Sequence, residues 1–118
     1  MAMKAKIYIA GPYSKGDPEK NVHEAIRVSN MLADLGFAPY VPHLTHYQEI
    51  LYHRPYEYWL ELDAEFVPCC DAVLRIPGES GGADREVALA KKLGLPIFTS
   101  ITDLCGYYGI SMQPIGVD

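Results

Sequence analysis

The stretch DAVLRIPGESGGADREVALAKKLGLPIFTS, residues 71–100, decides the fold class of this sequence. An apolar run at 71–78 leads through a glycine-rich loop into a patterned segment that ends at Gly94, and a second apolar run follows at 95–100. Short apolar runs bounded by turn residues indicate buried strands, and the longer segment between them is typical of a helix. Strands that alternate with helices predict a parallel sheet with right-handed crossovers.

The N-terminal part of the sequence continues this alternation. Residues 5–11, AKIYIAG, are predicted to form a buried strand that ends at a turn. Asp17 and Pro18 then provide an N-cap and a first helical residue, and Gly36 ends a helix that reaches about Leu35. The apolar positions of this helix recur every three to four residues, at Val22, Ala25, Ile26, Ser29, Leu32 and Ala33.

The middle of the sequence is less regular. Residues 37–44 are predicted as a second strand, which their prolines make irregular or place at an edge. The chain is then expected to be loop-like until Pro55, where a helix begins that extends to about Val67. This helix has an acidic stripe and an opposite apolar face. The stripe is Glu57, Glu61 and Glu65; the apolar face is Trp59, Leu62, Phe66 and Val67, together with Asp63. Residues 101–118 are weakly patterned and predict a short helix and a tail.

Composition limits the class of protein. A chain of 118 residues fits one compact domain, residues 1–118, and a net charge of −5 argues against the broad basic face that nucleic acids need. The three cysteines lack the spacing of a disulfide framework or a zinc site, which favours a reduced, cytoplasmic setting. Gly11 and Pro12 break the first apolar run before it is long enough for a signal peptide or a membrane span.

Three loops follow the predicted strands directly: GPYS, PHLTH and GESGGADRE. Ligands of parallel α/β sheets bind at the carboxyl ends of the strands. In the third loop, the Ser80 hydroxyl and the backbone N–H groups of Gly81 and Gly82 are predicted to bind a small anion, helped by the positive end of the following helix. The alternative is an ordinary capped helix, with Ser80 or Asp84 as N-cap and Glu86 as a first-turn acid.

Two carboxyl groups mark the candidate site. Asp63 shares a helix face with Trp59, so desolvation is expected to raise its pKa. Glu86 is expected to stay ionised, because it lies near a helix N-terminus and its N–H donors. Carboxyl groups whose pKa values are pushed apart can divide the acid and base roles between them. The alternative is that Asp63 pairs with Arg75 or caps a backbone group, and the sequence leaves these two interpretations equal.

Aromatic and histidine side chains complete the candidate pocket. Tyr13 is placed to stack on a flat ligand, although an aromatic ring there is as often packed. His43 and His46 have the spacing H-x-x-H but no third ligand, so His43 is predicted to line the pocket, and no metal or cofactor is expected. The predicted substrate-binding residues are therefore Gly11, Tyr13, His43, Ser80, Gly81 and Gly82.

These segments together resemble the nucleoside 2-deoxyribosyltransferase family, which includes the 2'-deoxynucleoside 5'-monophosphate N-glycosidases. The resemblance rests on IYIAGPYS, on the D-x7-D spacing from Asp63 to Asp71, and on the S-x5-E spacing from Ser80 to Glu86 before an alanine-rich helix. It implies a single Rossmann-like or flavodoxin-like α/β domain, with a parallel sheet of four or five strands flanked by helices.

The resemblance also implies a chemistry. Glu86 would be the nucleophile that attacks the anomeric carbon of the sugar, Asp63 would give a proton to the leaving base, and Tyr13 would contact base and sugar. Family members that act on free nucleosides are similar in having Asp where this chain has Ser80, whereas the monophosphate hydrolases have Ser. An aspartate would repel a 5'-phosphate, which a hydroxyl and glycine N–H groups can bind. The favoured substrate is therefore a nucleoside 5'-monophosphate.

Three alternatives stay open. The chain is a deoxyribosyltransferase if a second base, and not water, resolves the sugar ester. It is a phosphoribohydrolase if it cleaves only ribonucleotides, or a non-catalytic nucleotide sensor if it binds without turnover. The resemblance also implies a homodimer or higher homo-oligomer, for which Tyr107 and Tyr108 offer surface. Ser111 and Gln113 are candidates for the residue that completes a neighbouring subunit's site.

Overall fold

The protein is an α/β domain built on one parallel sheet, seen in a computed structural model that describes residues 3–112. The strand order is β2-β1-β3-β4, and every neighbouring pair is parallel. The strands are β1 (Lys6–Ala10), β2 (Ala38–Tyr40), β3 (Ala72–Arg75) and β4 (Ile97–Phe98). The predicted parallel sheet is confirmed, with four strands in the described part of the chain.

Five α-helices connect or follow these strands: α1 (Pro18–Asp34), α2 (Thr45–Leu51), α3 (Tyr56–Phe66), α4 (Gly81–Lys92) and α5 (Ile101–Tyr108). The Asp17 carboxylate caps α1 by accepting from the backbone N–H groups of Glu19 and Lys20, as predicted. No helix within residues 3–112 has both the length and the apolar character to cross a membrane.

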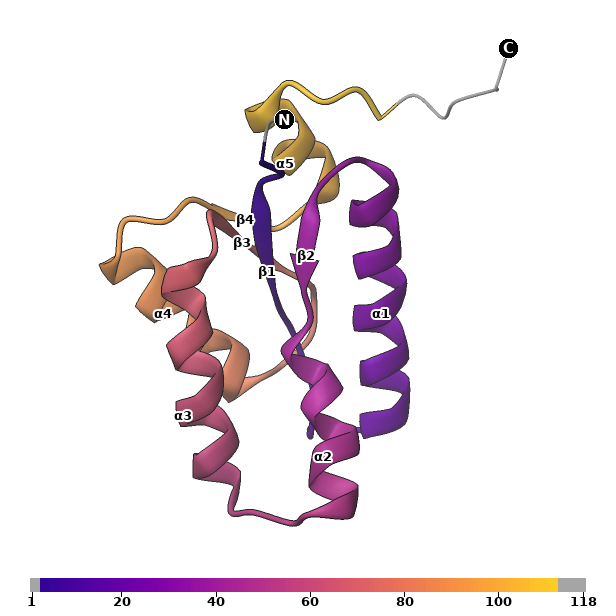
Figure 1. Ribbon diagram of the computed structural model, residues 1–118, viewed down its shortest axis with the longest axis vertical. Helices are drawn as coiled ribbons and strands as arrows, with labels where there is room; N and C mark the ends of the chain where they lie inside the picture. The colour runs from indigo at the N-terminus through magenta and orange to yellow at the C-terminus, as the bar shows by residue number, and fades with distance from the viewer. Residues whose placement is uncertain (1–2, 113–118) are drawn as a thin grey trace.

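The helices lie on both faces of the sheet, with α1 on one side and α3 and α4 on the other (Figure 1). Alternate side chains of β1 therefore enter two separate cores. Ile7 and Ile9 pack with residues of α1 and α5, whereas Tyr8 and Ala10 pack with residues of α4. All four of these side chains are fully buried, so β1 is the centre of the domain.

Three parts of the sequence prediction are wrong in detail. The predicted strand 37–44 is shorter, because Pro42–Leu44 form a 3-10 helix after β2, although β2 does lie at an edge. Residues 45–51, expected to be a loop, form α2. In α1 the buried positions include Val28, whereas Ile26 and Ala33 are exposed, and Phe66 of α3 is also exposed.

The point where strand order reverses lies between β1 and β3. The loops that leave these two strands approach closely, since a Cβ built on Gly11 would lie 2.2 Å from Cγ1 of Ile76. Gly78 has a φ of +123°, and a Cβ there would lie 2.5 Å from Cγ of Pro12. Only glycine fits this approach. It brings the GPYS and GESGG loops together at the end of the sheet where ligands of such folds bind.

Candidate active site

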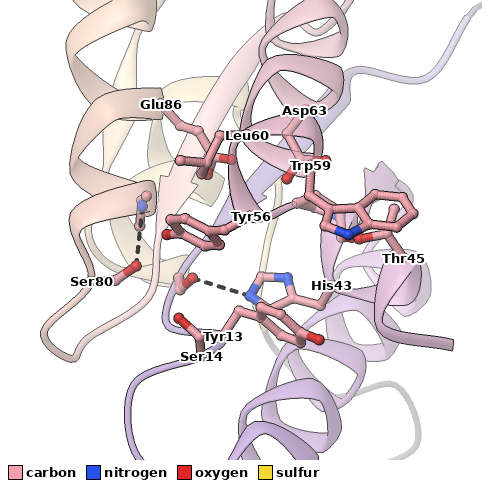
Figure 2. Close-up of a pocket in the computed structure, with 14 residues that line it drawn as sticks. Tyr13, Ser14, His43, Thr45, Tyr56, Trp59, Leu60, Asp63, Ser80 and Glu86 are labelled. Atoms are coloured by element: carbon pink, nitrogen blue, oxygen red, sulfur yellow. Dashed lines mark hydrogen bonds between the residues drawn. The ribbon is translucent and has the colours of Figure 1, made fainter. Parts of the chain in front are cut away.

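A cleft opens at this switch point, between the two loops, the start of α4 and the inner side of α3. The empty space in the cleft, counted together with the open solvent at its mouth, is about 520 Å³. Figure 2 shows Glu86 on α4 and Asp63 on α3 at one end of the cleft, with Ser80, Ser14 and Tyr13 toward the other. The structure therefore brings together residues that are up to 75 positions apart in the sequence, Gly11 and Glu86.

Glu86 is buried at the base of this cleft. Its side chain is on the second turn of α4, and only 9% of the residue is exposed. The hydroxyl of Tyr8 donates a hydrogen bond of 2.7 Å to Oε2. Burial raises the pKa of Glu86 to about 7, and the Tyr8 hydrogen bond opposes this rise. The alternative in which Glu86 is a first-turn acid is wrong, because α4 begins at Gly81 and its first-turn acid is Asp84.

Asp63 faces the same cleft from α3 without a partner for one of its oxygens. Oδ1 is buried and makes no hydrogen bond, and burial alone raises the pKa of this carboxyl to about 7. The alternative in which Asp63 pairs with Arg75 is wrong. Arg75 instead donates to the carbonyl oxygens of Ile76 and Gly78 and forms an ion pair of 3.1 Å with Asp84.

The two carboxyl groups differ in how they are held. Glu86 has a hydroxyl donor and two arginines, Arg75 and Arg85, that favour its ionised form, whereas Asp63 has burial alone. The negative charge of Asp63 would raise the pKa of Glu86 further, so the pair favours a single charge. We expect that charge on Glu86, where Tyr8 donates, and the proton on Asp63. Chemically, such a pair can divide an ionised and a protonated role within one cleft.

The glycine-rich loop lies at the other end of the cleft, where a serine side chain caps the following helix. The Ser80 hydroxyl caps α4 by accepting from the backbone N–H of Ala83 at 3.1 Å. Ser80 and Gly82 line the cleft, but the predicted Gly81 does not. A Cβ on Gly82 would lie 3.1 Å from both Leu60 and the Tyr56 hydroxyl, so α3 packs closely over this loop.

Tyr13 and His43 line the cleft as predicted, together with Gly11. His43 is 5% exposed, and its Nε2 donates to the carbonyl oxygens of Gly11 and Pro12 at 3.2 and 3.1 Å. Burial lowers the pKa of His43, so its ring is neutral. Nδ1 is therefore an acceptor, and it is buried without a hydrogen-bond partner. Within residues 3–112, no three His, Cys, Asp or Glu side chains gather as metal ligands would.

Several residues that line the cleft or contact its carboxyl groups were not predicted. Tyr8 was assigned only to a buried strand, yet its hydroxyl contacts Glu86. Tyr56, Trp59 and Leu60 form the wall contributed by α3. A tyrosine inside an otherwise aliphatic strand is the one sequence signal that pointed to Tyr8, since a buried hydroxyl needs a partner. Of the residues expected to complete a neighbouring site, Gln113 lies outside the described residues.

Comparison with known proteins supports the fold. A solved structure of the 2-deoxyribosyltransferase from the psychrotolerant bacterium Bacillus psychrosaccharolyticus superposes with a TM-score of 0.62 and 22% sequence identity. The match covers 82% of this chain and 76% of that one, and at this identity it establishes a shared fold. No curated protein matches the sequence. A family model described as a domain of unknown function, DUF7768, matches residues 5–100, and the chain therefore belongs to the DUF7768 family.

Proposed function

We propose that this protein cleaves the bond between base and sugar in nucleoside 5'-monophosphates, as a single catalytic domain. The observation that carries the proposal is the pair of buried carboxyl groups in one cleft, Glu86 with a hydroxyl donor and Asp63 without a partner for Oδ1. Hydrolysis of a glycosidic bond with a covalent intermediate needs such a pair, one ionised and one protonated.

The reaction proceeds in two balanced steps. The Glu86 carboxylate attacks the anomeric carbon, the carbon–nitrogen bond breaks, and Asp63 transfers its proton to the leaving nitrogen of the base. A water molecule then attacks the resulting sugar ester and gives a proton to the Asp63 carboxylate, which releases Glu86 as a carboxylate. Tyr8 keeps one oxygen of Glu86 fixed throughout, so the other oxygen is the one that reacts.

A 5'-phosphate suits the Ser80 end of the cleft. The first N–H groups of α4 have no carbonyl partner within the helix, and the helix dipole adds positive potential there. Ser80 can donate its hydroxyl proton to a phosphate while its oxygen accepts from Ala83. An acidic side chain in its place would repel the phosphate, which favours a nucleotide over a free nucleoside.

The test measures the release of free base by chromatography. The substrates are deoxynucleoside monophosphates, ribonucleoside monophosphates and free nucleosides. We expect release from a monophosphate by the wild-type protein, none by Glu86→Ala, and unchanged release by Glu61→Ala, which removes an exposed acid of α3. Binding of nucleotides without release would indicate a sensor. Cleavage of free nucleosides alone would contradict the assignment of Ser80.

A second candidate is exchange of bases between deoxynucleosides. It is favoured by the structural likeness to a 2-deoxyribosyltransferase. The two functions share the first step and differ in what resolves the ester. Addition of a second free base separates them, because a transferase forms the new nucleoside faster than it forms free sugar.

A further inference from the structure

Helix α2, which the sequence did not predict, contacts the cleft from outside through two polar side chains. His46 and Glu49 are three residues apart, so they lie on the same side of the helix. Each forms a hydrogen bond to an aromatic side chain of the cleft wall: His46 to Tyr13, and Glu49 to Trp59. One short helix thus holds two rings that come from different parts of the chain.

A chain of three side chains fixes Tyr13. The His46 ring is held by Oε1 of Glu19 at 3.1 Å on Nε2 and by the Tyr13 hydroxyl at 2.7 Å on Nδ1. Because a carboxylate only accepts, Nε2 carries a proton, and in the tautomer protonated on Nε2 alone Nδ1 accepts from Tyr13. Glu19 lies in the first turn of α1, next to α2 (Figure 1). The backbone of Tyr13 is held as well, by the Asn21 side chain at 2.8 Å.

A single carboxylate fixes Trp59. Glu49 accepts from the indole Nε1 at 2.8 Å, from the backbone N–H of Arg54 at 2.8 Å, and from Nδ1 of His53. These donors, led by the Arg54 backbone, lower the pKa of Glu49 to about 2, so the acceptor is charged throughout the neutral range. Charge-assisted hydrogen bonds are about twice as strong as neutral ones. The same carboxylate therefore links α2 to α3 and to the segment that connects the two helices.

The two rings have places that suit a flat ligand. Trp59 lies one helical turn before Asp63 on α3, next to the proposed proton donor. Tyr13 lies in the loop that follows β1, beside Ser14, and is drawn below His43 in Figure 2. A base whose leaving nitrogen reaches Asp63 lies against the Trp59 wall, and Tyr13 bounds the same cleft farther from Asp63.

We infer that Glu19, His46 and Glu49 are positioning residues, which hold Tyr13 and Trp59 as a preformed binding surface for the base. This inference rests on the proposed function. None of the three residues lines the cleft, so they act through the two rings. They therefore set the affinity for the base-bearing substrate and leave the rate of bond cleavage nearly unchanged.

The experiment compares binding of a deoxynucleoside monophosphate with binding of 2-deoxyribose 5-phosphate, which lacks the base. The variants are His46→Ala, Glu49→Ala, Glu49→Gln and the control Glu61→Ala. Trp59 is the only tryptophan of the 118 residues, so its fluorescence reports on one wall of the cleft without requiring activity. Circular dichroism verifies that each variant is folded, and turnover is measured in parallel to separate KM from kcat.

We expect Glu49→Ala and His46→Ala to weaken nucleotide binding about tenfold, the loss of one good hydrogen bond. Binding of 2-deoxyribose 5-phosphate and kcat should stay within about twofold. Glu49→Ala should also expose Trp59 to a soluble quencher, and Glu49→Gln should restore part of both effects, because its amide oxygen can still accept from the indole.

Equal loss of the nucleotide and the base-free sugar phosphate would overturn the inference, as would wild-type affinity in both alanine variants. A fall in kcat at unchanged KM would also overturn it. Failure of the proposed function is separate from all of these, since it shows as absence of base release by the wild-type protein while the binding comparison still applies.

Discussion

The two faces of the sheet place one strand in two different environments. Toward α1 and α5, Ile7 and Ile9 pack in a cluster of apolar side chains, such as Ala25 and Leu32. Toward α3 and α4, the neighbouring Tyr8 reaches a buried carboxyl group, Glu86. Burial of apolar side chains on the first face stabilises the domain, whereas burial of polar groups on the second face lowers its stability. Polar burial next to a cleft is therefore the best indicator of where the chemistry lies.

The sharpest test of this contrast is Glu86→Gln, on the polar face. Loss of the nucleophile should lower the rate of base release by about 10³-fold or more, because an amide does not form the sugar ester. The measurement is single-turnover release of base with excess protein. Residual activity above about a tenth of wild type would mean that another group attacks the sugar.

Leu32→Ala probes the apolar face. Leu32 is fully buried in α1, and its truncation should lower the free energy of unfolding by about 3 kcal/mol. The rate per folded molecule should not change. Urea unfolding and titration of active sites measure the two quantities, and a loss of rate without a loss of stability would contradict the division between the faces.

The pH dependence of stability should come from the polar face. The folded pKa of Glu86, about 7, is above its usual 4.5, so the folded state binds this proton more tightly than the unfolded state. Stability from this group is complete below about pH 4.5 and is lost as the pH rises through about 7.

Glu86→Gln, which has no such titration, should therefore gain about 3 kcal/mol on wild type at pH 8 and little at pH 4.5. The urea unfolding midpoints of wild type and variant at the two pH values test this prediction. Parallel curves for the two proteins would show that the burial of Glu86 costs nothing.

The smallest expected effect is that of Tyr8→Phe, which removes one hydroxyl from β1. Without its donor, Glu86 should keep its proton to a higher pH, so the acid limb of the rate profile moves upward and the rate at pH 7 falls about tenfold. A rate profile over pH 5–9 tests this. An unchanged acid limb would mean that Tyr8 only packs.

The sequence predicted the parts of the fold that local patterns determine. The strand 5–11, the Asp17 cap and the helix ended by Gly36 follow from apolar runs and turn residues. Helix α2 was missed because its N-cap residue, Leu44, makes no side-chain cap and the helix has no buried residue of its own. Such a helix is stabilised by hydrogen bonds to distant residues, which no local pattern contains.

The site was predicted in its residues better than in its electrostatics. Asp63 was expected to have a raised pKa because its apolar neighbours are on its own helix. Glu86 was expected to stay ionised, and the rise of its pKa was not predicted, because its buried surroundings include β1, far away in sequence. The roles proposed for both residues stay predictions until the rates are measured.

The central position of β1 has a consequence for how the chain is made. This strand is synthesised before the other three strands of the sheet, and its two neighbours, β2 and β3, are complete only at Tyr40 and Arg75. The hydrogen-bond partner of the Tyr8 hydroxyl, Glu86, comes 78 residues later in the chain. Until then this central strand lacks both its hydrogen bonds and its cover, so the nascent chain is most prone to aggregate before α4 has been completed.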